Sequence, residues 1–367
     1  MSKNNEIAAS YDVVVVGGGA AGLSGALVLA RSRRSVLVVD AGEPRNASAA
    51  QMHNFLSRDG MNPLALLDVG QAEVRAYGGV VVQGRVRSAT QATDGFRVTL
   101  DDGRTVPARR LLITTGLVDQ LPEIPGLRER WGRDVIHCPY CHGWEVRDQA
   151  VGVLASGPMG VHQALLFRQL TADVVLFRHT APPLGAEQAE ELRASDIRVV
   201  EGRVVGLEVE DDQLAGVRLE NGTVVDRQAL VVGAPMVARS DALISLGLQP
   251  VEHPLGLGEF IPGNPTGQTD VTGVWVAGNV SDLSATVIGA AAQGVVAAAA
   301  INADLVAEDI RRAVATLRNP SQGETARDSA AWLGTIAGPD GARHDQVRQR
   351  NSVRETPEPE RVHGKRS

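Results

Sequence analysis

The chain contains two cysteines, Cys138 and Cys141, in a segment that reads Val-Ile-His-Cys-Pro-Tyr-Cys-His-Gly-Trp over residues 135–144. Two cysteines separated by two residues can close a small redox disulfide. Such a pair is also half of a common zinc site, but zinc needs four surrounding ligands and there is no second cysteine pair. His137 and His142 bracket the cysteines, yet four ligands so close in sequence would struggle to form a tetrahedron. The alternatives are an incomplete metal site or a purely structural thiol pair; redox chemistry without a metal is the favoured prediction.

A neighbouring histidine suits that chemistry. The thiolate is the attacking species, and an imidazole can lower the pKa of a thiol or carry its proton. His137 and His142 are therefore candidate catalytic residues together with the two cysteines.

A glycine-rich turn near the N-terminus predicts a nucleotide site. The apolar run over residues 11–16 has the character of a buried parallel strand and leads directly into the turn. Gly17, Gly19 and Gly22 fit G-x-G-x-x-G, in which the first glycine makes the turn, the second admits a pyrophosphate and the third lets the helix pack on the strand. The helix N-terminus then faces the phosphates. A second strand ends at Asp40, where a carboxylate can bind a ribose hydroxyl.

The rest of the N-terminal region alternates predicted helices and strands. Residues 41–60 are rich in turn formers and polar groups, and such a loop could cover a bound cofactor. Asp101-Asp-Gly103 lies between two alternating runs and predicts a hairpin. The other expected elements are a helix over 64–77 and strands over 79–83, 96–100, 104–106 and 111–116.

Length and charge restrict the class of protein. A chain of 367 residues suggests two domains of about 100–200 residues each. The formal net charge of −7 offers no basic surface for nucleic acid, and no long unbroken apolar run predicts a membrane span. The polar N-terminus lacks the apolar core of a signal peptide, and the cysteines are too few for a disulfide-stapled secreted fold. We therefore expect a cytoplasmic protein.

Four motifs, taken together and in order, resemble those of the low-molecular-weight thioredoxin reductases. The resemblance covers about residues 11–305 and implies an α/β fold of two Rossmann-like, three-layer ββα nucleotide-binding domains, the second inserted into the first. Residues 1–118 and 245–317 would bind FAD, residues 119–244 would carry the redox pair, and residues 318–367 would be a mostly mobile tail. The motifs are Gly17–Gly22, Thr114-Thr-Gly116 with Ile124-Pro-Gly126, Cys138-x-x-Cys141, and Gly273-Val-Trp-Val-Ala-Gly-Asn279.

The resemblance also implies roles for single residues. The second cysteine, Cys141, would lie against the flavin C4a atom, and the first, Cys138, would exchange with substrate. Asn279 stands where the family usually has an acid, and Asp282 follows three residues later. A small-residue helix from Thr286 to about Ala303 would point its N-terminus at the flavin. The implied FAD-binding residues are Gly17, Gly19, Ala20, Gly22, Asp40, Thr115, Gly116, Gly278, Asn279 and Val287.

The nicotinamide site of the inserted domain departs from the family pattern. Ala155 replaces the first glycine of its motif, although Gly157 and Gly160 still allow a phosphate to approach. Members that use NADPH carry a basic cluster after the second strand, whereas this chain has Arg178 and His179 followed by prolines. NADP(H) use is therefore permitted but doubtful, and the retained glycines could equally serve as scaffold.

The redox motif favours one direction of electron flow. Cys-Pro-Tyr-Cys-His-Gly resembles the motif of the dithiol oxidases of gliotoxin, holomycin and romidepsin biosynthesis, whereas the reductases carry Cys-Ala-Thr-Cys-Asp-Gly. His142 can take a proton from an incoming dithiol near neutral pH. We expect a homodimeric FAD enzyme that oxidises a small-molecule dithiol through Cys138 and Cys141 and reduces O2 to H2O2. The alternatives are an NADPH-dependent disulfide reductase and a redox sensor that acts on a partner through its tail.

Overall fold

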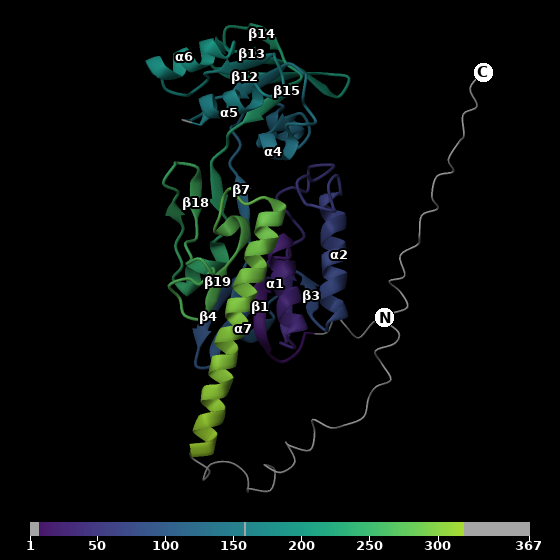
Figure 1. The fold of residues 1–367 in the computed structure, drawn as a ribbon, viewed down its shortest axis with the longest axis vertical. Coiled ribbons are helices and arrows are strands. Elements are labelled where there is room, and N and C mark those ends of the chain that lie inside the picture. The colour runs from purple at the N-terminus through teal and green to yellow at the C-terminus, as the bar shows by residue number, and fades with distance from the viewer. Residues whose placement is uncertain (1–6, 158, 319–367) are drawn as a thin grey trace, which may run out of the picture. The chain divides into compact units, whose positions relative to one another are not determined.

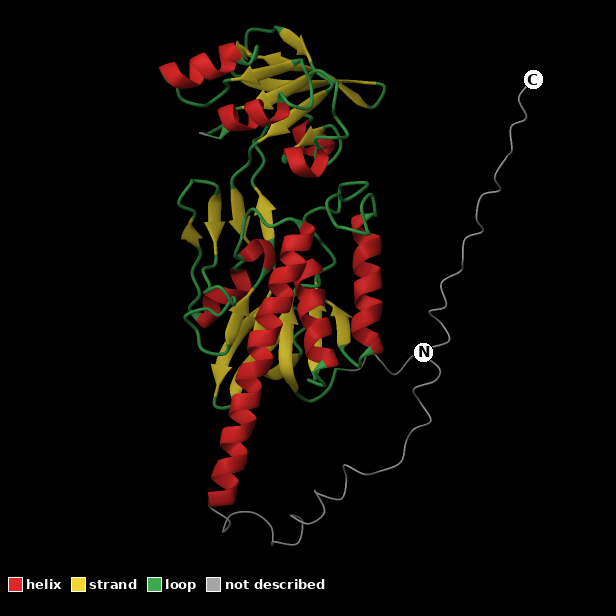
Figure 2. Cartoon of the chain, in the orientation of Figure 1, coloured by secondary structure: helices red, strands yellow, loops and turns green. Residues whose placement is uncertain are grey.

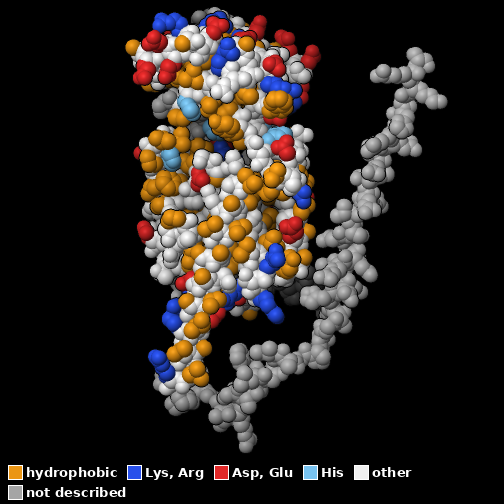
Figure 3. Space-filling view, viewed as in Figure 1, with side chains coloured by type: hydrophobic (Ala, Val, Ile, Leu, Met, Phe, Trp, Pro, Cys, Tyr) orange, Lys and Arg blue, Asp and Glu red, His pale blue; other side chains and the backbone are white. Residues whose placement is uncertain are grey.

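A computed structural model describes residues 7–157 and 159–318. Figure 1 shows the ribbon. Residues 1–307 form one compact unit and residues 308–367 a second. The second unit contains the last turns of helix α7, in which Arg312 pairs with Glu308, and which expose Ile310 and Leu317. Figure 3 shows apolar side chains along this helix. The predicted tail, with Trp332 and Leu333, lies outside the described residues beyond Arg318.

A seven-stranded sheet combines both ends of the chain. Its strands follow the order β3-β2-β1-β6-β5-β4, and β19 from the C-terminal part pairs in parallel with β6. Helices α1, α2 and α7 pack on one face in a shared apolar core, and Figure 2 shows these helices with the sheet. The bounds are β1 Tyr11–Val16, β2 Val36–Asp40, β3 Val80–Gln83, β4 Val86–Ala92, β5 Gly95–Leu100, β6 Thr105–Ile113, β19 Val274–Val276, α1 Ala20–Arg31, α2 Pro63–Ala76 and α7 Val287–Arg318.

A second, wholly parallel sheet lies in the middle of the chain, in the order β11-β10-β9-β15-β8. Helices α5 and α6 pack on one face, and an antiparallel sheet of β12, β13 and β14 packs on the other. The redox pair follows β8 directly. The bounds are β8 Val135–Ile136, β9 Val151–Leu154, β10 Val174–Phe177, β11 Arg198–Val200, β12 Val204–Glu210, β13 Gln213–Leu219, β14 Val224–Asp226, β15 Ala229–Val232, α5 Gly160–Phe167 and α6 Ala186–Ala194.

Two strands connect these regions. The chain leaves the first sheet through β7, which is Leu117–Asp119, and returns through β16, which is Met236–Ala238. The two strands pair with each other, and β16 also pairs with β18, Gly258–Phe260, which pairs with β17, Val251–Glu252. The α/β fold with a second Rossmann-like domain inserted into the first is therefore confirmed. The boundaries at residues 118, 245 and 317 stay predictions.

Two predicted elements differ from the structure. The strands expected over 104–106 and 111–116 are one strand, β6, which runs through Pro107. Proline fits here because β6 begins to pair with β1 only at Ala108. No residue of β1 therefore needs a hydrogen bond from the backbone nitrogen of Pro107, which proline could not donate. The helix expected to end near residue 303 continues to Arg318, since strong helix formers and an i,i+4 ion pair follow without a glycine or proline.

Helix α7 is also the one described helix that is long and apolar enough to cross a membrane by length and composition. Its inner face is buried in the core of the first sheet, through Ala290, Gly294, Ala297, Ile301 and Leu305. That packing accounts for the apolar residues of the inner face, whereas Val295, Val296 and Val306 are exposed.

Candidate active site

A cavity of about 680 Å³ lies within residues 1–307. This volume is in the range of sites that hold cofactors and small ligands. The β1–α1 turn, the ends of β2 and β6, the start of α7, the loop over 41–53 and the redox segment all contribute to its lining. Nine of the ten residues predicted to bind FAD line the cavity; the exception, Gly22, lies beneath the turn.

The β1–α1 turn has the shape that a pyrophosphate requires. Gly17 has a φ of +106°, and a Cβ there would lie 2.4 Å from the carbonyl oxygen of Thr114. A Cβ on Gly22 would lie 2.0 Å from the carbonyl oxygen of Gly17, whereas Gly19 faces open space. No side chain caps α1, so its first N–H groups are available at the cavity. These glycines fit the phosphates of a dinucleotide.

Asp40 ends β2 beside this turn. Its Oδ1 atom accepts a hydrogen bond of 3.1 Å from the backbone N–H of Gly18. The same carboxylate lines the cavity, and its binding of a ribose hydroxyl stays a prediction.

The opposite wall comes from the C-terminal part of the chain. Gly278 has a φ of +77° and donates its N–H to Gln293 at 2.8 Å. The amide Nδ2 of Asn279 donates to the carbonyl oxygens of Asp282 and Ala285, which leaves its oxygen for a ligand. Asp282 does not line the cavity; its carboxylate accepts a hydrogen bond from Gln293, so it does not replace the acid missing at position 279.

The redox cysteines lie at the same cavity, on the short helix α4, Pro139–His142. Their Sγ atoms are 2.9 Å apart. A hydrogen bond from the Cys141 thiol, assisted by the backbone N–H groups of Cys141 and Tyr140, lowers the pKa of Cys138 to about 6. The same interaction raises the pKa of Cys141. In the dithiol form Cys138 is therefore the thiolate.

The flanking histidines are placed as neutral bases. Burial lowers the pKa of His137, and its Nδ1 lies 3.1 Å from the carbonyl oxygen of Val232, to which it can only donate, so Nε2 carries the lone pair. Burial also lowers the pKa of His142, whose buried Nε2 has no hydrogen-bond partner within residues 7–157 and 159–318. Both histidines line the cavity. In that described part of the chain, no group of three or more His, Cys, Asp or Glu side chains could hold a metal ion.

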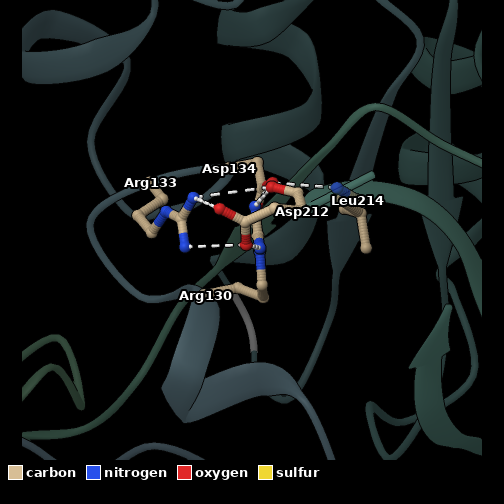
Figure 4. A network of polar contacts seen from close by, with 5 residues as sticks. All are labelled: Arg130, Arg133, Asp134, Asp212 and Leu214. Atoms are coloured by element: carbon tan, nitrogen blue, oxygen red, sulfur yellow. Dashed lines mark hydrogen bonds and ion pairs between the residues drawn. The ribbon is translucent and has the colours of Figure 1, made fainter. Parts of the chain in front are cut away.

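An ionic network centred on the buried Arg130 fixes the strand that leads to the cysteines. Figure 4 shows Arg130 with Asp134 and Asp212, and Arg133 beside Asp212. Asp134 directly precedes β8 and accepts hydrogen bonds from Arg130 Nε at 2.8 Å and from the N–H of Leu214 at 2.9 Å. The start of β8 is thereby held to the β12–β13 hairpin, two residues before His137.

Sequence reasoning missed two site residues, Arg45 and His53. Arg45 donates to both carboxylate oxygens of Asp119, at 2.8 and 2.6 Å, and its charge lowers the pKa of Cys138. His53 lines the cavity from the loop after β2. Both lie in the polar segment that the sequence predicts only as a cover for a cofactor. The sequence does place an arginine and a histidine soon after Asp40, and this position after a nucleotide-binding acid could have marked them as candidate site residues.

Residues 11–294 match the family described as pyridine nucleotide-disulphide oxidoreductase. The chain belongs to this family. It is 32% identical over 314 residues to "Thioredoxin reductase tcpT" of Claviceps purpurea, which covers 81% of this chain and 95% of the relative. The crystal structure of HlmI is 46% identical, with a TM-score of 0.81, over 87% of this chain and 100% of that one. An oxidoreductase from Agrobacterium tumefaciens is 35% identical, with a TM-score of 0.76, over 81% and 99%.

Membership in the pyridine nucleotide-disulphide oxidoreductases makes this chain an oxidoreductase that acts on thiols and disulfides, with FAD as its cofactor. The cavity fits that cofactor, because the glycine turn, Asp40 and the start of α7 supply the donors and acceptors described above. Gly17, Gly19 and Ala20 would hold its phosphates, and Asp40 its ribose.

The second nucleotide fold of this family member is altered at both of its recognition points. Arg178 binds Glu201 through Nε and donates from Nη1 to the carbonyl oxygen of Ala181 at 3.0 Å, so its guanidinium is engaged within the protein. His179 accepts the N–H of Val204 at 3.0 Å. Ala155 is buried, and its methyl group lies against Gly160, at the position where the motif has its first glycine.

Proposed function

We propose that this protein is a FAD-dependent dithiol oxidase that closes an intramolecular disulfide in a small-molecule dithiol. One observation carries the proposal: Arg178, the arginine that follows the second strand of the inserted domain, is engaged by Glu201, whereas the cysteine pair and its flanking histidines line the cavity. Electrons therefore enter from a dithiol rather than from a nicotinamide. When bound, FAD accepts the electron pair and is reoxidised by O2, which becomes H2O2.

The chain's own residues account for the thiol chemistry. One substrate thiol gives its proton to His142 and attacks Sγ of Cys138 in the Cys138–Cys141 disulfide, which releases Cys141 as a thiolate. The second substrate thiol gives its proton to the histidine pair and attacks the substrate sulfur bound to Cys138. The substrate disulfide forms and Cys138 leaves as a thiolate. The low pKa of Cys138 makes it a good leaving group in this second step.

The alternative is an NADPH-dependent disulfide reductase, the reading that the name of the Claviceps relative favours. The occupied Arg178 speaks against it. A redox sensor acting through the tail involves residues outside those that the structure describes.

Mixing the holoenzyme with each reductant without oxygen distinguishes the dithiol oxidase from the NADPH-dependent reductase. We expect dithiothreitol to bleach the flavin absorbance of the holoenzyme rapidly and NADPH to bleach it slowly. With air present, dithiol turnover should consume O2 and produce H2O2. Rapid bleaching by NADPH with an inert dithiol would overturn the oxidase. The Cys141→Ser variant should lose the dithiol reaction, because no disulfide remains to accept the electrons; full turnover by this variant would contradict the proposed relay.

The pH dependence tests His142. Its lowered pKa keeps the ring neutral at pH 7, so the base is present above that pKa and is lost as the pH falls through it, below about 6.5. His142→Ala should slow flavin reduction by a dithiol by about 10²-fold or more at pH 7 and flatten this acid limb. An unchanged rate across pH would exclude His142 as the base. His253→Ala is the control, because that ring packs on Phe260 and does not line the cavity.

A further inference from the structure

A compact loop brings a third histidine to the redox segment. Met52 and Met61 form an isolated antiparallel bridge that closes residues 52–61. Inside the loop, Oδ1 of Asp59 accepts the N–H of Asn54 at 2.9 Å, and Oδ2 lies 3.3 Å from Nδ1 of His53. Asn54 has a φ of +62°, a conformation that asparagine tolerates well. The loop thus holds His53 in one orientation.

The same loop contacts the residues around the cysteines. The side chain of Asn54 donates to the carbonyl oxygen of Tyr140 in α4. Nε2 of His53 lies 3.2 Å from Oε1 of Glu145, close enough for charge attraction but not aligned for a hydrogen bond. His53 lines the same cavity as His142 and Cys141, and its side chain is 18% exposed. It is therefore covered by protein yet close to the surface carboxylates.

Carboxylates from two segments lie near His53. The titratable groups that face it are Asp59 from its own loop and His142 and Glu145 from the redox segment. The N–H of Asn54, and then His53 itself, hold the pKa of Asp59 below its usual range, so Asp59 is a carboxylate at neutral pH. Burial lowers the pKa of His142; Glu145 opposes this shift, and His53 and His137 add to it.

We propose that His53 is the proton exit of the redox site, taking the proton that His142 removes from a substrate thiol and releasing it to water beside Asp59 and Glu145. The inference rests on the dithiol oxidase function. Each proton leaves a substrate S–H, moves to the unpartnered Nε2 of His142, then to Nε2 of His53, and then to solvent. The electron pair stays with the sulfur atoms, so the relay changes no redox balance.

Protonated His142 needs a group that can take its proton. A buried imidazolium without a hydrogen-bond partner is unstable and must lose its proton before the second substrate thiol can react. Asp59 and Glu145 are exposed enough to exchange protons with water, at 68% and 38% of their side-chain surface. His53 contacts both carboxylates and lines the same cavity as the buried base.

The test is stopped-flow reduction of the flavin in the holoenzyme by dithiothreitol, without oxygen, from pH 6 to 9 and over a range of imidazole buffer concentrations. His53→Gln should slow reduction about tenfold at pH 7, and added imidazole should restore most of the rate by accepting the proton from His142. Asn54→Ala is the structural comparison: loosening the loop should lower the rate by a similar factor at every pH, with no rescue by imidazole. His253→Gln should match the wild type.

The outcomes separate the relay from the function. If the wild type is reduced by dithiothreitol and His53→Gln shows the wild-type rate and buffer dependence, the relay is overturned and the oxidase stands. If His53→Gln is slow but insensitive to imidazole, as expected of Asn54→Ala, His53 has only a structural role and the relay is also overturned. If dithiothreitol does not reduce the wild type, the oxidase function fails and the relay fails with it.

Discussion

At the scale of single residues, the two cysteines differ in chemistry although they are three positions apart. Cys138 is the N-cap of α4, where backbone N–H groups stabilise a thiolate. Cys141, one turn later, donates to that thiolate. The positive charge of Arg45 acts on both thiols in the same sense, toward lower pKa.

The thiolate can be measured by alkylation of the reduced protein. Because the pKa of Cys138 is lowered to about 6, its thiolate predominates above that pH, and iodoacetamide should label Cys138 before Cys141 at pH 7. The labelling rate should rise with pH along a titration curve whose midpoint lies near pH 6. Arg45→Gln removes a cation and should move the midpoint to higher pH, whereas Arg45→Lys should retain most of the effect. Peptide mass spectrometry identifies the labelled residue; a wild-type midpoint near 9 would contradict the assignment.

The chemistry of the site was predictable from sequence where it depends on local spacing. Cys138, Cys141, His137 and His142 fall within one short segment, so their proximity follows from the chain itself. Arg45 reaches the site by binding Asp119, 74 residues away in sequence, and no local pattern encodes that contact. His53 was hidden for the same reason, since Glu145 is its partner from another part of the chain.

At the scale of elements, two helices form the wall behind the flavin cavity. Gly25 in α1 and Gly294 in α7 allow close contact, because a Cβ on Gly294 would lie 2.0 Å from the carbonyl oxygen of Ala21. A Cβ on Gly25 would lie 3.0 Å from the carbonyl oxygen of Gly294. These glycines permit both helix N-termini to reach one cavity.

Substitution at this crossing should loosen it. Gly294→Ala places a methyl group against backbone that cannot move away alone, so we expect a loss of about 1–3 kcal/mol in the free energy of unfolding and weaker retention of FAD. Urea unfolding and flavin release measure the two effects. Gly289→Ala is the matched control, because its nearest neighbour is the Thr286 hydroxyl at 3.5 Å, and it should be neutral or stabilising by up to about 1 kcal/mol. If both variants had the same stability and the same retention of FAD, the close contact of α1 and α7 at Gly294 would have no special importance.

Sequence patterns also fixed most elements but not all of their ends. The helix expected over 64–77 is α2, at Pro63–Ala76, and the Asp101–Gly103 hairpin joins β5 to β6. The extent of β6 depends on where its neighbour β1 begins, which is a tertiary property. The end of α7 lies beyond the apolar stretch because helix propensity, rather than burial, continues it.

At the scale of the molecule, the two nucleotide folds have diverged. The first retains its glycine turn and acid, and β19 from the far end of the chain completes its sheet. The second retains its parallel sheet and its core, which support β8 and the redox segment. Under the proposed function it would serve mainly to position the cysteines.

The assembly of the whole chain is also testable. We expect a homodimer, as the resemblance implies, with sedimentation equilibrium giving twice the mass of one chain and FAD bound to each copy. A single-chain mass at micromolar concentration would contradict this expectation. We also expect the protein in the cytoplasmic fraction of its cells, which fractionation with an antibody would check.

The ion pair between Arg178 and Glu201 has a consequence for metabolism under the proposed function. An enzyme that takes its electrons from the dithiol and passes them to O2 would not depend on the cell's supply of reduced pyridine nucleotide. Its turnover would instead follow the supply of dithiol and of oxygen.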